Sequence, residues 1–196
     1  MADAPATIPP DLRPTDVPTR VLDAAEAIVL ARGVAGLTLE AAARDAGVSK
    51  GGLLYHFASK EALLVAMMRR MAAYVLSEYE ACVAAQPPGR ARVARAVLEW
   101  GFGEGDYACN ERHDRAAAVY LAAHHHDPAL LDPMREVFAR MRADLAADGL
   151  PPGHGAAILA AGDGLFMARV FRLYAPTAPE RAAMRTALGM LLEGGA

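Results

Sequence analysis

The stretch of residues 38–57 constrains the fold more than any other part of the chain. Thr38 precedes a short helical pattern, Gly47 marks a tight turn, and Ser49 precedes a second short helical pattern that ends at Phe57. Thr and Ser side chains accept hydrogen bonds from first-turn N–H groups, so each marks the start of a helix. Two short helices joined by a glycine-containing turn predict a helix-turn-helix, whose second helix can enter the major groove of DNA.

The rest of the chain is also helical in its pattern. Ala and Leu are frequent whereas β-branched and aromatic residues are few, which favours helix over strand. No run of useful length has the period of a strand, and Pro and Gly separate the helical segments. We therefore predict an all-α fold of about nine helices. Outside the helix-turn-helix, the expected helices cover residues 18–33, 59–86, 90–102, 112–125, 133–147, 154–174 and 178–192.

Side chains around the second short helix are typical of a DNA-binding surface. Residues near the start of such a helix face the base edges. Here they are Ser49, Lys50, Gly51 and Gly52. The window 46–60 contains no Asp or Glu, and it holds both lysines of the chain, Lys50 and Lys60. Each glycine costs a helix about 1 kcal/mol relative to alanine, a cost that close backbone approach to DNA would explain.

Lys60 falls at the start of the next helix. Backbone N–H groups and the helix dipole favour an anion there, so a DNA phosphate is one predicted partner. The alternative is a solvated surface lysine.

Composition argues against several other classes of protein. The formal net charge is −3, so nucleic-acid binding must depend on local arrangement rather than on overall charge. No apolar run is long enough to cross a bilayer, the start of the chain lacks a signal-peptide pattern, and Cys82 and Cys109 lack metal-ligand spacing. We therefore expect a cytoplasmic protein. Because no nucleophile–base pattern or phosphate-binding glycine motif is visible, we expect no enzyme and no cofactor.

The helix-turn-helix stretch and its lead-in, residues 19–25, resemble the DNA-binding domain of the TetR family of transcriptional regulators. The resemblance covers residues 18–66, and its most specific part reads GVSKGGLLYHFASKEALL. It implies a homodimer that binds a pseudo-palindromic operator in double-stranded DNA. It also implies a repressor that a small-molecule effector releases, with an activator of the same fold as the alternative. The expected domains are a flexible arm (1–15), the TetR-type DNA-binding domain (16–66) and a helical effector-binding and dimerisation domain (67–196).

The resemblance also implies roles for single residues. Thr38 and Lys60 would bind phosphates, Tyr55 and His56 would contact the DNA backbone, and residues 49–52 would face the groove. Val48, Leu53 and Phe57 would pack inside the small domain. Two positions depart from the commoner pattern, since Gly52 stands where Thr or Asn is frequent and Leu54 stands where an aromatic ring is frequent.

The effector pocket is expected in the C-terminal half. Methionine and aromatic side chains adapt to apolar ligands, so we predict an apolar or aromatic effector, with Arg169, His124 or Tyr120 holding a polar group. Ordinary core packing is the alternative for each residue. The candidates are Met67, Met71, Tyr74, Trp100, Phe102, Tyr107, Tyr120, His124, Phe138, Met141, Phe166 and Arg169.

Apolar stripes on the last two long helices fit the dimer interface that the resemblance implies. Packing against the monomer's own core is the alternative, and for Phe166 the two are equally weighted. The predicted interface residues are Ile158, Leu159, Gly162, Leu165, Val170, Leu188, Leu191 and Leu192.

The run His124-His125-His126 raises the question of a metal. Consecutive helical residues point about 100° apart, so three adjacent histidines cannot converge on one ion from a regular helix. A helix end near Pro128 could relax this constraint, and His113 with Asp114 could add a ligand. We predict no metal site, with a metal-responsive regulator as the alternative.

Overall fold

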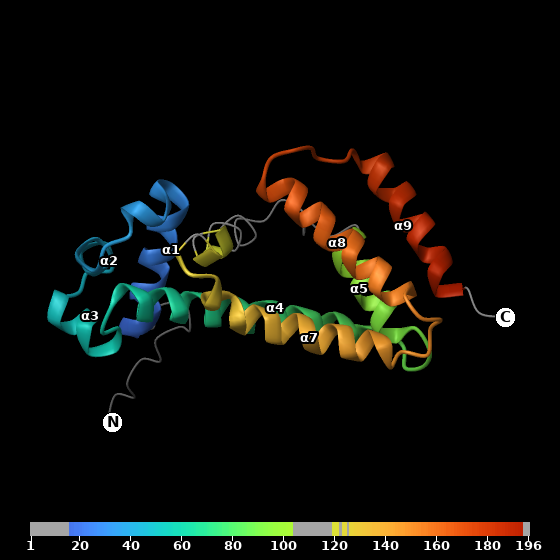
Figure 1. Cartoon of the computed structure of the whole chain (residues 1–196), viewed down its shortest axis with the longest axis horizontal. Helices are drawn as coiled ribbons and strands as arrows, with labels where there is room; N and C mark the ends of the chain where they lie inside the picture. Colours follow the sequence, from blue (N-terminus) through green and yellow to red (C-terminus); the bar gives the residue numbers. More distant parts are fainter. Residues whose placement is uncertain (1–15, 104–118, 122, 125, 194–196) are drawn as a thin grey trace, which may run out of the picture. The chain divides into compact units, whose positions relative to one another are not determined.

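The computed structural model describes residues 16–103, 119–121, 123–124 and 126–193, and throughout these ranges its regular structure is helical. This confirms the predicted all-α class. The elements (Figure 1) are α1 (Val17–Gly36), α2 (Leu39–Asp45), α3 (Lys50–His56), α4 (Lys60–Ala85), α5 (Arg92–Phe102), the 3-10 helix η3 (Pro128–Leu131), α7 (Asp132–Ala146), α8 (His154–Val170) and α9 (Ala178–Glu193). Of the helices so described, none combines the length and apolarity needed to cross a membrane.

The chain divides into two compact units, residues 1–63 and 64–196. In the first unit α1, α2 and α3 pack against one another in all three pairs. Their shared interior is small and tightly filled, because Val21, Ala25, Leu37, Ala42 and Leu53 are each 0% exposed. This interior leaves the outer side of α3 to solvent.

Side-chain caps begin the helices at the positions that the sequence predicted. The hydroxyl of Thr38 accepts a hydrogen bond from Ala41 N (3.0 Å), that of Ser49 from Gly52 N (3.0 Å) and that of Ser59 from Ala62 N (3.1 Å). Gly47, between α2 and α3, has a φ of +66°, which a residue with a side chain adopts only at a cost. Local chemistry therefore determines the helix-turn-helix.

In the second unit α5 is the central helix, packing against α8, α9 and α7. Ala94 of α5, Met141 of α7 and Ile158 of α8 are fully buried in this core. The start of α5 carries no cap of its own. Instead the buried carboxylate of Asp148, which follows α7, accepts hydrogen bonds from Val93 N (3.1 Å) and Ala94 N (2.8 Å).

The predicted helix 154–174 is too long, because α8 ends at Val170. Arg172 takes a left-handed conformation with φ +52°. Its N–H donates to Arg169 O (2.9 Å) and the next N–H, of Leu173, donates to Ala168 O (2.8 Å). This pair of bonds is a Schellman cap, which closes a helix even where no glycine or proline marks the end in the sequence.

Candidate nucleic-acid interface

The outer side of α3 is exposed along its whole length. Leu53 is the one residue of this helix that is buried, whereas Tyr55 is 86% exposed. Lys50, Gly51 and His56 also face solvent. The structure thus brings the predicted groove-facing and backbone-contacting residues of α3 onto a free surface, where another molecule can reach them.

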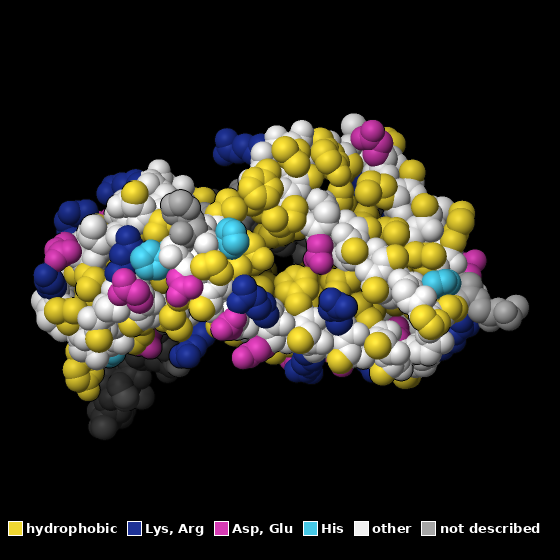
Figure 2. Space-filling model, viewed as in Figure 1, with side chains coloured by type: hydrophobic (Ala, Val, Ile, Leu, Met, Phe, Trp, Pro, Cys, Tyr) yellow, Lys and Arg dark blue, Asp and Glu magenta, His cyan; other side chains and the backbone are white. Residues whose placement is uncertain are grey.

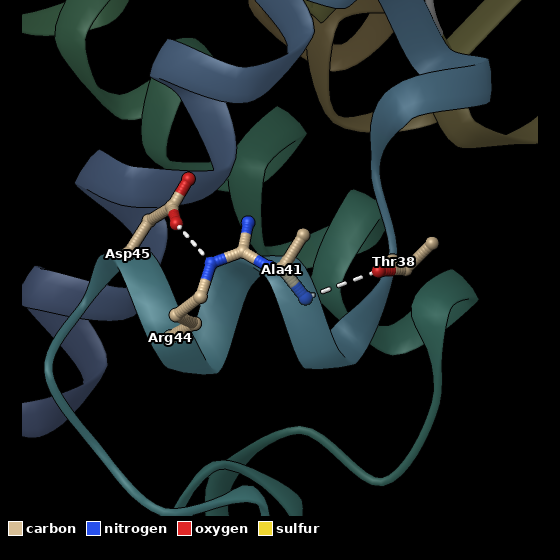
Figure 3. A network of polar contacts seen from close by, with 4 residues as sticks. All are labelled: Thr38, Ala41, Arg44 and Asp45. Carbon is tan, nitrogen blue, oxygen red and sulfur yellow. Dashed lines mark hydrogen bonds and ion pairs between the residues drawn. The ribbon is translucent and has the colours of Figure 1, made fainter.

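Two capping hydroxyls lie next to this surface, at the starts of α2 and α3. Figure 3 shows Thr38 bonded to Ala41 N at the start of α2, with an ion pair between Arg44 and Asp45 (3.0 Å) at its end. Thr38 and Ser49 are themselves exposed. A hydroxyl that accepts one hydrogen bond keeps its own proton to donate, so both residues can cap a helix and bind a phosphate oxygen.

The two glycines of α3 differ in what the fold requires of them. Neither has a positive φ. A Cβ built on Gly52 would lie 3.2 Å from Ser49 Oγ, so a side chain there presses on the cap of α3. A Cβ on Gly51 meets nothing within 4 Å. The absence of a side chain at Gly51 therefore serves no contact within the described part of the chain.

We predict that Gly51→Ala stabilises the free protein and weakens DNA binding. Alanine favours helix over glycine by about 1 kcal/mol, and its methyl group would point into open space. Thermal unfolding should show the gain in stability. Fluorescence anisotropy with operator DNA should show a several-fold loss of affinity, because the methyl group holds the backbone away from the groove. Unchanged affinity would contradict close approach at Gly51.

Lys50 has a carboxylate partner that the sequence window concealed. Its Nζ lies 2.5 Å from Glu40 Oε1 of α2, and the side chains are 57% and 62% exposed. The hydrogen bond from Lys50 lowers the pKa of Glu40 below its usual range. Residues 46–60 contain no Asp or Glu, but the fold brings the carboxylate of Glu40 next to Lys50 from outside this window. Because exposed ion pairs contribute at most about 1 kcal/mol, a DNA phosphate can replace Glu40 as the partner of Lys50.

Lys60 takes a position that neither sequence hypothesis considered. Its Nζ donates a hydrogen bond to Val34 O (2.9 Å), at the end of α1. The bond adds a second donor to a carbonyl that already accepts Leu37 N (3.1 Å). This carbonyl lies just beyond Gly33, where φ is +67° and the regular part of α1 ends as predicted. The ammonium group keeps two further protons that a phosphate could accept. A substitution of Lys60 would therefore change stability as well as charge.

The predicted effector residues lie in several environments. Met67 and Met141 are 0% exposed, Phe102 is 3% exposed and Met71 is 8% exposed, so these four fill the core. His124 is exposed, and Tyr107 lies outside the described residues. The remaining candidates are half-buried: Tyr74, Trp100, Tyr120, Phe138, Phe166 and Arg169.

A pocket of about 440 Å³ lies in the second unit, and none of these candidates lines it. Its lining comes from the end of α4, the start of α5 and the end of α7. Tyr79 Oη donates to Asp144 Oδ2 (2.8 Å), and burial with this bond raises the pKa of Tyr79. Arg140 pairs with Glu80 (2.9 Å), and Arg92 donates to Val83 O (3.0 Å). These polar groups pair with one another, so they hold neighbouring helices together and are not arranged around a ligand.

The metal alternative receives no support from the described histidines. Within the described ranges, no three His, Cys, Asp or Glu side chains lie close enough to hold an ion. His124 and His126 are exposed at the end of their helical segment, whereas His113 and Asp114 lie outside the described residues.

Two residues predicted for the dimer interface belong to the monomer's own core. Ile158 is 0% exposed and Leu159 is 6% exposed, so neither offers a surface to a second copy. At Gly162 the close neighbour is also internal, because a Cβ on Gly101 of α5 would lie 3.6 Å from its Cα. Leu165, Val170, Leu188, Leu191 and Leu192 are half-buried, and no residue of α9 is buried.

The exposed side of α8 consists of small residues that the predicted interface did not include. Ala156, Ala160 and Gly164 follow one another at intervals of four and all face solvent. Their spacing of four could have indicated this face in the sequence. The prediction instead followed the larger apolar residues of the same helix. Small residues on one face allow another helix to approach closely.

Two family models match the chain. The model described as "Bacterial regulatory proteins, tetR family" matches residues 21–67, and that described as "Tetracyclin repressor-like, C-terminal domain" matches residues 91–193. Among curated proteins, none matches the chain.

Several solved structures are similar to the chain over nearly its whole length. SCO1917 from Streptomyces coelicolor A3, a member of the TetR family, is 26% identical over 91% of this chain and 99% of its own, with a TM-score of 0.63. The multidrug binding protein EbrR complexed with malachite green is 28% identical over 91% and 99%, with a TM-score of 0.61. EbrR complexed with ethidium is 28% identical over 90% and 99%, with a TM-score of 0.62.

Proposed function

The chain belongs to the TetR family of transcriptional regulators, and on that premise we propose that it is a repressor that an aromatic effector releases from its operator. Residues 16–66 form the DNA-binding domain, and residues 67–196 bind the effector and a second copy of the chain. The proposed DNA contacts are Thr38, Ser49, Lys50, Gly51, Gly52, Tyr55, His56 and Lys60.

The exposed outer side of α3 is the observation that carries this proposal. α3 buries one residue, and its free side carries a base, two glycines and a phenol. The packing of the first unit does not require these side chains to be exposed, whereas binding of a partner does. The groove of DNA fits this side, since an α-helix enters it and reads base edges near the helix start.

A twofold dimer places two copies of α3 on one face of the duplex. The half-sites then lie about 34–36 Å apart, or a multiple of that distance. An effector that changes this spacing lowers the affinity for DNA, and by linkage DNA lowers the affinity for the effector by the same factor. The exposed sides of α8 and α9 are the proposed contact between the copies.

The effector class rests on the similarity to EbrR and on side-chain composition. Malachite green and ethidium, the ligands of EbrR in two of its structures, are aromatic cations. Half-buried aromatic residues of the second unit, such as Trp100 and Phe166, can contact flat rings. We propose that the effector is aromatic and binds among the helices of this unit.

We predict that Lys50→Ala weakens operator binding and reduces its dependence on salt. Each phosphate contact contributes about 0.9 to the slope of log affinity against log salt, so losing one from each subunit reduces the slope by about 2. Fluorescence anisotropy at several salt concentrations, with operator found by selection from genomic fragments, measures both quantities. Lys50 is the better position for this test than Lys60, whose loss would also remove the bond to Val34.

The matched control is Arg142→Ala, which removes an exposed base from the second unit. It should leave the slope unchanged. If both variants keep the slope of the original protein, Lys50 does not contact phosphate. If no duplex binds with a salt-dependent affinity, the proposed function is wrong.

A further inference from the structure

Asp163, in the middle of α8, is a half-buried carboxylate without a visible partner. Among the described residues nothing donates a hydrogen bond to it or forms an ion pair with it. Its neighbours in sequence are Gly162 and Gly164, and Cβ atoms built on them would meet nothing within 4 Å. The backbone of α8 therefore has open space beside it at the residue before Asp163 and at the residue after it.

The surroundings of Asp163 are apolar. On a helix, residues three and four positions away lie beside a side chain, so the neighbours of the carboxylate on α8 are Leu159, Ala160, Phe166 and Met167, of which Ala160 faces solvent. α5 packs closely against α8 at this level, where Gly101 approaches Gly162, and Trp100 and Phe102 flank that glycine. Figure 2 shows hydrophobic side chains gathered over part of α8.

Such a position is unfavourable for a charge in the absence of a ligand. Burial alone raises the pKa of Asp163 from 3.8 to about 6, so at neutral pH the group is still mostly ionised but has lost part of its hydration. A positive charge brought next to it would restore the lost stabilisation. Among the described residues of the second unit, no positively charged side chain pairs with Asp163 to provide this stabilisation.

We propose that Asp163 binds the positive charge of an aromatic organic cation in the effector site of this protein. This inference rests on the proposed function and names the chemistry of its effector. Metal ions such as Mg²⁺ and Ca²⁺ fit less well, because they require several oxygen ligands whereas the neighbours of Asp163 are apolar. An organic cation needs one carboxylate for its charge and apolar surface for its rings, and the junction of α5 and α8 offers both.

The test compares two probes that differ in charge. Ethidium is an aromatic cation, and 3,8-diamino-6-phenylphenanthridine has the same rings without the fixed charge. Fluorescence titration of the full chain at pH 8 with each probe would use the original protein, Asp163→Asn and a control, Asp132→Asn. Asp132 is an exposed carboxylate of α7 in the same unit, so the control makes the same change in net charge.

We expect Asp163→Asn to weaken ethidium binding by roughly 10- to 100-fold and to change binding of the neutral probe less than about 2-fold. Asp132→Asn should change neither. The melting temperature of the ligand-free protein should rise by roughly 2–6 °C in Asp163→Asn, because the substitution removes a poorly hydrated charge. A rise in stability together with a loss of cation binding separates a ligand contact from a structural role.

Two outcomes would overturn the inference. Equal losses for both probes would mean that Asp163 acts through the shape of the unit, and no loss for ethidium would mean that the cation binds elsewhere or not at all. Operator release by the neutral probe alone would leave the proposed function standing while this inference fails. Failure of operator binding in the original protein would instead concern the proposed function.

Discussion

Asp148→Ala is expected to lower the free energy of unfolding by about 3 kcal/mol, because its buried carboxylate accepts both Val93 N and Ala94 N at the start of α5. Hydrogen bonds to a charged acceptor contribute more than neutral ones, and removal of this acceptor leaves two N–H groups unsatisfied at the start of the central helix of the second unit. α5 packs against α7, α8 and α9, so its loss of order would spread to all three. No other side chain is seen to cap this helix in the described structure.

Thermal and urea unfolding measure this effect, with an expected fall in melting temperature of roughly 6–12 °C. Asp127→Ala is the matched control. The carboxylate of Asp127 caps the 3-10 helix by accepting Ala129 N (2.9 Å), but it is exposed, so its loss should cost at most about 1 kcal/mol. Asp148→Asn should fall between the two, because an amide oxygen can still accept one of the bonds. Equal effects of the two alanine variants would contradict a special role for Asp148.

The parts of the fold that the sequence predicts are those that depend on neighbouring residues. Thr38, Ser49 and Ser59 cap helices through bonds to N–H groups three residues away, so a short window contains the whole interaction. Asp148 was not predicted as a cap because the bonds to α5 span more than fifty positions. The end of α8 was missed for a different reason, since Arg172 adopts a conformation that usually marks a glycine.

The same division applies to the candidate site. The exposed residues of α3 follow from a local motif, and the structure presents them on a free surface. The partners of Lys50 and Lys60 do not follow from it, because Glu40 and Val34 are brought there by the packing of α2 and α1. In the second unit, helical spacing alone could not decide which side of α8 faces inward. Large apolar residues suggested an interface, yet burial assigns Ile158 and Leu159 to the core.

Ala160→Arg is expected to convert the protein to a monomer and to weaken operator binding by at least about 100-fold. In the chain by itself this side chain faces solvent, at the middle of the small-residue face formed by Ala156, Ala160 and Gly164. An arginine there should leave the monomer folded. Between two closely packed copies of α8, however, its long side chain would force the helices apart, and Asp163 three residues along could neutralise its charge but could not make room for it.

The loss of affinity follows from losing the link between the two half-sites. A dimer that holds one half-site presents its second α3 at a high effective concentration, which adds a factor of about 10² to 10⁴ to the affinity. Arginine also adds positive charge, so electrostatics alone would strengthen DNA binding, and a loss must come from dissociation of the subunits. Analytical ultracentrifugation gives the oligomeric state, and anisotropy gives the affinity.

Ala139→Arg supplies the control, because Ala139 is exposed on α7 and the same charge is added to the same unit. This variant should remain dimeric and bind operator at least as tightly as the original protein. If Ala160→Arg stays dimeric with unchanged affinity, the copies meet through another surface. If instead the original protein is already a monomer that binds operator tightly, recognition does not require a twofold arrangement, and the spacing mechanism for effector release has no basis.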